Sequence, residues 1–257
     1  MEVLQDEIAA MFSLALKVAS IQYRAVAANK IENIKCLSSL VEEASVNGAM
    51  FIVLPEMCTT GLNIKNDEEA RILAETVPGP STGVFSRLAA CYKVYLVLGL
   101  AEYDRTANKY YNSQIILGPN GQIIGKYRKI HLFGPDHNWA EIGDLGYQAV
   151  DVEWGRIGLG ICFDINYQEF VEFISGAHVH IFAFSTNWVG ADVPFLYWAE
   201  LVAKRGFYFI AANNWGKEGD IDFSGGSLLL SPDLSVLSQS ATSANMILYA
   251  SIDLAKV

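Results

Sequence analysis

Residues 155–184 read GRIGLGICFDINYQEFVEFISGAHVHIFAF, and the alternation within this stretch decides the fold. It begins with a short apolar segment, Arg156–Phe163, which predicts a buried strand. Apolar side chains then recur at the spacing of a helix, at Tyr167, Phe170, Val171 and Ile174. Gly176 ends the helical pattern, and the apolar run Val179–Phe184 predicts a second buried strand. The stretch is therefore typical of an α/β chain with parallel strands.

The same order of elements occurs earlier in the chain. A helical pattern has its apolar residues at Ile34, Leu37, Val41 and Ala44. Gly48-Ala49 leads from it into the apolar run Met50–Leu54, and the later segment Ser227–Asp233 resembles Ser113–Asn120. This internal duplication predicts two related sheets that pack face to face with helices outside. No low-complexity linker divides the chain, so we expect one domain over residues 14–257, preceded by an extension at 1–13.

Composition narrows the class of protein. The 257 residues are 52% hydrophobic and 18% charged, which suits one large domain with a substantial core. A net charge of -10 repels nucleic acid and anionic membrane, so we expect neither partner. The four cysteines form no CxxC pair, and acidic residues near Met1 do not resemble an export signal. A reducing, cytoplasmic location is the expectation.

Cys162 is the first candidate for chemistry. It comes at the end of a predicted strand, where Gly158 and Gly160 allow a close approach of the backbone and a sharp turn. A thiol at a strand-to-helix turn lies near backbone N–H groups, which lower its pKa below the usual value of about 8.5. Such a cysteine is a candidate nucleophile, and the alternative is a packed core thiol.

Glu56 and Lys129 also follow predicted strands, at the position where α/β folds place their sites. Glu56 comes directly after five apolar residues and a proline. A carboxylate buried there would have a raised pKa and could serve as a general base, although a solvated strand end is the alternative. Lys129 lies in a basic cluster with Lys126 and Arg128, which by itself favours a solvated face.

Five sequence blocks, taken together, resemble the nitrilase or carbon–nitrogen hydrolase superfamily. In chain order they are FIVLPEMCTTG, VPGPST, NSQIILGPNGQIIGKYRKIHLF, GRIGLGICFDINYQEF and FSGGSLLLSPD. The resemblance extends from about Leu16 to the C-terminus, and the blocks occur in the order of the family. It implies an αββα sandwich of two mixed sheets with outer helices, whose subunits pair into a four-layer homodimer or a higher homo-oligomer.

The resemblance also implies the role of each candidate. Glu56 would be the general base, Cys162 the nucleophile, and Lys129 the group that stabilises the tetrahedral intermediate. The backbone N–H of Phe163 would be a second oxyanion donor. Glu141, in HNWAEIGDLG, resembles a second glutamate that holds Lys129 or the substrate nitrogen. The implied reaction is hydrolysis of a non-peptide C–N bond in a small amide or ureido substrate, without a metal or cofactor.

The segment after the nucleophile departs from the family. Many members read roughly CYDxRFPE, whereas this chain has Asn166 where some relatives use an arginine to grip a substrate carboxylate. A carboxylate-bearing substrate therefore requires another cation, such as Arg156 or Arg205. Asn187 and Trp188 fall where the family lines its pocket, although packing at a strand end would also explain them. Candidate substrates are ω-amides of dicarboxylic acids, N-carbamoyl β-amino acids or polyamines, and aliphatic amides.

Other readings are weaker. His178 and His180 share one face of a strand and could bind zinc, but no third ligand has a clear spacing. A Ser-His-Asp hydrolase is not expected, because the chain has no GxSxG motif. Two further alternatives stay open: an inactive relative that acts as a binding or scaffold protein, and an enzyme that transfers the acyl group to an amine instead of water.

Overall fold

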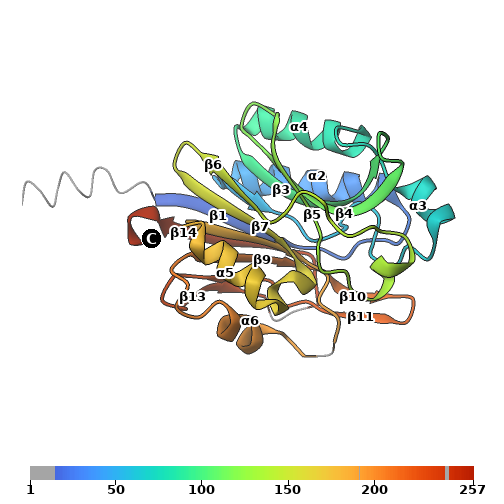
Figure 1. Cartoon of the computed structure of the whole chain (residues 1–257). Coiled ribbons are helices and arrows are strands. Elements are labelled where there is room, and N and C mark those ends of the chain that lie inside the picture. The colour runs from blue at the N-terminus through green and yellow to red at the C-terminus, as the bar shows by residue number, and fades with distance from the viewer. Residues whose placement is uncertain (1–14, 191, 241–242) are drawn as a thin grey trace, which may run out of the picture.

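Two six-stranded mixed sheets lie face to face with helices on both outer sides (Figure 1). The computed structural model describes residues 15–190, 192–240 and 243–257. The extension expected at residues 1–13 lies outside these ranges. Within them, no helix is both long enough and apolar enough to cross a membrane.

The first sheet has the order β14-β1-β2-β3-β4-β5. Its strands are β1 (Ala15–Gln22), β2 (Phe51–Val53), β3 (Tyr95–Asp104), β4 (Lys109–Leu117), β5 (Ile123–Arg128) and β14 (Met246–Asp253). Strands β1, β2 and β3 are parallel to one another, and β4, β5 and β14 pair antiparallel to their neighbours.

The second sheet repeats this pattern in the order β6-β7-β8-β9-β12-β13. Its strands are β6 (Gln148–Val152), β7 (Gly155–Ile161), β8 (Ile181–Thr186), β9 (Tyr208–Asn213), β12 (Leu228–Leu230) and β13 (Val236–Gln239). Three central strands are again parallel, with antiparallel strands on both sides. The predicted duplication and sandwich are therefore confirmed.

Helices cover the two outer faces (Figure 1). On the first sheet lie α2 (Lys30–Val46) and α4 (Pro80–Tyr92), and on the second lie α5 (Gln168–Gly176) and α6 (Phe195–Leu201). The short elements are α3 (Asp67–Leu73), the β10–β11 hairpin (Trp215–Glu218 and Ile221–Ser224) and the 3-10 turns η1 (Gly134–Asn138), η2 (Cys162–Asn166) and η3 (Leu254–Lys256).

Alternate side chains of each central strand enter different cores. Phe51 and Val53 point between the two sheets, whereas Ile52 and Leu54 pack with the first helical layer. All four are fully buried. Strands that are covered on both faces have continuous apolar sequences, which is why the runs in the sequence identified them.

The carboxyl ends of the two sets of parallel strands meet at one edge of the sandwich. The Ser185 hydroxyl, at the end of β8, donates a hydrogen bond of 2.7 Å to the carbonyl of Leu54, directly after β2. Gln114 of β4 donates to the same hydroxyl at 2.8 Å. This contact between the sheets brings the segments after β2, β5, β7 and β8 together, and these segments carry the candidate residues.

Candidate active site

Glu56 lies in a tight turn after β2 and is 1% exposed. The next residue, Met57, has a left-handed backbone with φ of 48°. The turn rests directly on β3 at Gly99, where an added Cβ would come within 2.6 Å of the Glu56 Cα. Gly99 therefore provides the space that lets the carboxylate turn inward between the sheets.

Lys129 follows β5 and is also 1% exposed. Its backbone N–H donates to the carbonyl of Asn112, which fixes the start of the segment. Its ammonium group lies 2.7 Å from Glu56 Oε1 and 2.7 Å from Asp136 Oδ2. The basic cluster in the sequence is thus divided: Lys126 and Arg128 pair with Glu102 on β3, while Lys129 points into the sandwich.

Asn112 and Asp136 complete this group, and the sequence reading did not include either. The Asn112 amide donates to Glu56 Oε1 at 2.8 Å and to Asp136 Oδ1 at 3.0 Å. Asp136 lies in η1 and is fully buried. A signal for Asn112 was present, because Asn112-Ser113-Gln114 places three polar residues inside an apolar strand, and buried polar groups need partners. We refer to Glu56, Asn112, Lys129 and Asp136 as the charged cluster.

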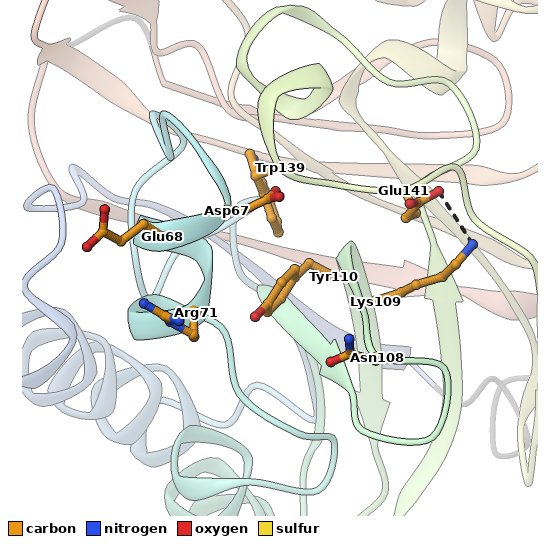
Figure 2. A pocket seen from close by; sticks show the side chains of 8 residues that line it. All are labelled: Asp67, Glu68, Arg71, Asn108, Lys109, Tyr110, Trp139 and Glu141. Atoms are coloured by element: carbon orange, nitrogen blue, oxygen red, sulfur yellow. Dashed lines mark ion pairs between the residues drawn. The ribbon is translucent and has the colours of Figure 1, made fainter.

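Glu141 lies outside the charged cluster, contrary to the expectation from the resemblance. Its backbone N–H donates to the carbonyl of Tyr110 at the start of β4, and its side chain is 54% exposed. Figure 2 shows the carboxylate turned toward Lys109, with 3.6 Å between the charged atoms. The two residues line a polar hollow of about 740 Å³ that shares no lining residue with the pocket at Cys162. Asp136, five residues earlier, occupies the position expected for Glu141 beside Lys129.

Cys162 begins η2 directly after β7, with a left-handed φ of 44°. This conformation costs a residue with a Cβ roughly 1–2 kcal/mol, so the surrounding contacts must hold it. The buried Asp164 carboxylate accepts the N–H of Ile161 at 3.0 Å and that of His131 at 3.1 Å. Asp164 therefore connects the cysteine turn to the segment that carries Lys129.

The glycines before Cys162 allow close packing, as the sequence suggested. A Cβ on Gly160 would lie 2.5 Å from the Phe170 ring, and one on Gly158 would lie 2.9 Å from Ile174. Both contacts are with α5. The helix can therefore pack closely against β7, and η2, which connects the two, lines the pocket with Cys162, Phe163 and Asn166.

The ionisation of the site differs from the expectation in one respect. Burial raises the pKa of Cys162, the Glu56 carboxylate raises it further, and Lys129 only partly opposes them. The resting thiol is therefore neutral, and the expected low thiol pKa is wrong because burial outweighs the backbone N–H groups. Burial also raises the pKa of Glu56. Burial alone would lower the pKa of Lys129, but Asp136 and Glu56 raise it well above its ordinary value.

A pocket of about 270 Å³ opens above Cys162. Its lining residues are Phe133, Cys162, Phe163, Asn166, Asn187, Trp188, Val189 and Tyr197. The structure thus brings Phe163, Asn166, Asn187 and Trp188 to one cavity with Cys162. The Asn187 backbone N–H donates to Glu56 Oε2 at 2.9 Å, which links the pocket wall to the carboxylate.

The two asparagines of the pocket differ in their hydrogen bonding. Asn166 donates to the carbonyl of Phe163 at 3.0 Å, and its amide oxygen accepts the hydroxyl of Tyr197. Asn187 is 1% exposed, and neither its amide nitrogen nor its amide oxygen has a partner among the described residues. A buried amide without partners is costly, and this position therefore suits a polar ligand.

The possible zinc pair does not form a metal centre in the described parts of the chain. His180 Nδ1 accepts the backbone N–H of Arg156 at 3.1 Å. Across residues 15–190, 192–240 and 243–257, no group of three histidine, cysteine or acidic side chains is arranged to hold a metal ion.

Known proteins resemble this chain over most of its length. The chain is 34% identical to a nitrilase of Pyrococcus abyssi over 240 residues, which cover 93% of this chain and 90% of the relative. It is 29% identical to an omega-amidase of Homo sapiens, over 96% of this chain and 91% of that protein.

Solved structures show the same fold. An amidase from Nesterenkonia sp. superposes with a TM-score of 0.81 at 17% identity, over 94% of this chain and 91% of that one. Nit3 of Saccharomyces cerevisiae, a member of the nitrilase superfamily, gives a TM-score of 0.82 at 22% identity, over 93% and 90%. Residues 17–257 match the carbon–nitrogen hydrolase family, and the chain belongs to that family.

Proposed function

We propose that this chain hydrolyses a C–N bond in a small linear amide or N-carbamoyl amine and releases ammonia through a thioester on Cys162. One observation carries the proposal. A buried ammonium and a buried carboxylate, Lys129 and Glu56, lie 2.7 Å apart, and Glu56 accepts the backbone N–H of Asn187, which lines one pocket with Cys162. The similarity to a nitrilase and an omega-amidase supports a reaction at a carbon–nitrogen bond.

The first half of the reaction forms the thioester. Glu56, whose pKa is raised by burial, takes the Cys162 proton as the sulfur attacks the substrate carbonyl carbon. The Lys129 ammonium and the Phe163 backbone N–H stabilise the oxyanion, and one such donor is worth about 2.7–4 kcal/mol of barrier. Protonated Glu56 then gives its proton to the departing nitrogen as the C–N bond breaks, so ammonia leaves.

The second half returns the enzyme to its starting state. Glu56 accepts a proton from water as the water oxygen attacks the thioester carbon. The C–S bond breaks, the acid is released, and the proton returns to the sulfur. Asp136 favours the charged form of Lys129 throughout, because its carboxylate opposes the effect of burial and raises the pKa of the amine.

Asn187 is the proposed partner of the substrate amide. Its side chain offers one unpaired donor group and one unpaired acceptor in the pocket wall. A carboxamide or ureido group carries the complementary acceptor and donor. Asn187 would thus orient the substrate, while its backbone N–H holds the general base.

An ammonia-release assay over short aliphatic amides, ω-amides and N-carbamoyl amines tests the proposal. We expect release by the parent and a loss of at least about 10³-fold in Cys162→Ala. Cys91→Ala is the matched control, because Cys91 is an exposed thiol on α4 and should leave the rate unchanged. Equal ammonia release from Cys162→Ala and the parent would remove the mechanism and favour a binding or scaffold role.

The nature of the acyl acceptor is tested in the same assay. Hydrolysis releases a free acid, whereas acyl transfer yields a new amide when an amine such as hydroxylamine is present. We expect the acid as the main product at moderate amine concentration. The homodimer and the cytoplasmic location stay predictions, and sedimentation of the purified chain tests the first of them.

A further inference from the structure

The pocket at Cys162 has a neutral, mainly aromatic wall. None of its eight described lining residues is charged. Four of the eight are aromatic and form two pairs of rings: Phe133 and Phe163 lie 5.0 Å apart, and Trp188 and Tyr197 lie 5.6 Å apart. Such a wall matches an apolar group. A charged group would lose its hydration there and gain few interactions that replace it.

The cations that could have gripped a carboxylate lie elsewhere. Arg156 is at the opposite end of β7 from Cys162, about 20 Å away along the strand, and its guanidinium pairs with Asp151 at 2.6 Å. Arg205 precedes β9 and therefore also lies at the end of the sheet away from the pocket. Lys129 already contacts two carboxylates and is 1% exposed.

Asn166 takes the place where some relatives use an arginine, and both ends of its amide are engaged. It donates to the carbonyl of Phe163 and accepts from the Tyr197 hydroxyl. Asn166 therefore holds an aromatic ring over the pocket and is not free to bind a carboxylate.

The neutral surface continues outward from the pocket. Trp188, Val189 and Tyr197 also line a neighbouring hollow of about 700 Å³, whose further lining includes Pro194, Phe195 and Leu196. Its one charged lining residue among those described is Asp192, an anion. The net charge of -10 adds long-range repulsion against anionic substrates.

From these observations we infer that the substrate carries a neutral, apolar acyl group that extends from Cys162 along Trp188 and Tyr197 toward the neighbouring hollow. The inference rests on the proposed function and narrows it, because ω-amides of dicarboxylic acids become poor substrates. Aromatic rings attract an ammonium group and so compensate part of its lost hydration, but they do not compensate the lost hydration of a carboxylate. The expected order is therefore neutral, then cationic, then anionic acyl groups.

Three amides with six carbons each test this order: hexanamide, its ω-amino derivative, and the monoamide of adipic acid. We expect kcat/KM for hexanamide to exceed that of the amino derivative by about tenfold and that of the acid by about 100-fold. A preference for either charged amide would overturn the inference.

Binding to Cys162→Ala, measured by calorimetry, separates this inference from the proposed function. The inactive variant should bind hexanamide more tightly than the two charged amides. If the parent hydrolyses none of the three but the variant keeps this order, the proposed reaction fails and the neutral pocket stands. If the variant binds a charged amide best, the inference fails whatever the hydrolysis assay shows.

Asn166→Arg tests whether an arginine at this position, as in some relatives, changes which acyl group the pocket accepts. The substitution should reduce the preference for hexanamide over the adipic acid monoamide by about tenfold or more. Gln168→Arg adds the same charge at an exposed position on α5, outside the pocket lining, and should not change the ratio. Equal ratios in both variants and the parent would show that the pocket at Asn166 does not select the acyl group.

Discussion

The two sheets end at the same edge of the sandwich but bring different chemistry to it. The first sheet supplies the charged cluster, in which Lys129 contacts two carboxylates and Asn112 connects them. The second supplies Cys162, the rings of Phe163, Trp188 and Tyr197, and an Asn187 side chain without partners in the described chain. The first sheet thus holds the charged groups, and the second sheet holds most of the groups that would contact the substrate.

This division has a physical reason. Buried charges are tolerated only when they are paired and hydrogen-bonded, so the charged half has to be rigid and closed. A pocket has to leave polar groups unpaired until a ligand arrives. A sandwich of two duplicated sheets allows both, since each sheet is stabilised by its own outer core and the two meet only between their inner faces.

The largest effect is expected from breaking the charged half at Asp136. Asp136→Asn keeps the size of the side chain but removes its charge, so the pKa of Lys129 falls relative to the parent because only Glu56 remains to oppose burial. We expect kcat to fall roughly 10²-fold, and the alkaline limb of the pH–rate profile to move to lower pH. Glu141→Gln is the matched control, because its exposed carboxylate pairs with Lys109. A loss in Glu141→Gln that equals the loss in Asp136→Asn would restore Glu141 as the second catalytic carboxylate.

Asp164, which connects the two halves, should make stability depend on pH. Burial raises its pKa from 3.8 to about 7, so the folded state prefers the protonated form. The stabilisation is complete below about pH 4 and is lost as pH rises through about 7, by on the order of 4 kcal/mol. Urea unfolding at several pH values should therefore show a steeper decline in the parent than in Asp164→Asn. Identical slopes would exclude Asp164 as the titrating group.

A substitution at Gly99 tests how closely β3 must pack against the turn that carries Glu56. Gly99→Ala places a Cβ 2.6 Å from the Glu56 Cα and 2.8 Å from the Met57 nitrogen. Because both neighbours are backbone atoms, the turn must move, at a cost of about 1–3 kcal/mol. Chemical denaturation measures this loss, and activity should fall more than stability because Glu56 is displaced. Gly83→Ala on α4 is the control, since its nearest neighbour is 3.9 Å away at the end of an arginine side chain.

The smallest expected effect concerns the protonation state of Cys162 in the free enzyme. Because burial raises the pKa of Cys162, the free enzyme should contain no thiolate at neutral pH. Ultraviolet difference absorbance between the parent and Cys162→Ala should show no thiolate band there. A thiolate band that disappears with the substitution would mean that Lys129, not Glu56, controls the ionisation of the sulfur.

The sequence by itself determined the two-sheet sandwich and three of the reactive positions. Runs such as Met50–Leu54 and the helical pattern of α5 are local, and their periodicity follows from which faces are buried. Glu56, Lys129 and Cys162 each follow such a run, so their placement at strand ends could be predicted. The duplication could also be read, because the order of the elements is repeated along the chain.

Only the tertiary structure decided the partners of these residues. Asp136 and Glu141 are carboxylates five positions apart in one irregular segment, and no periodicity says which of them turns inward. The choice depends on the backbone bond from Glu141 to Tyr110 and on the pairing of Asp136 with Lys129. The thiol pKa likewise depends on burial by residues distant in sequence. Long-range contacts set both burial and charge pairing, and a local pattern contains neither.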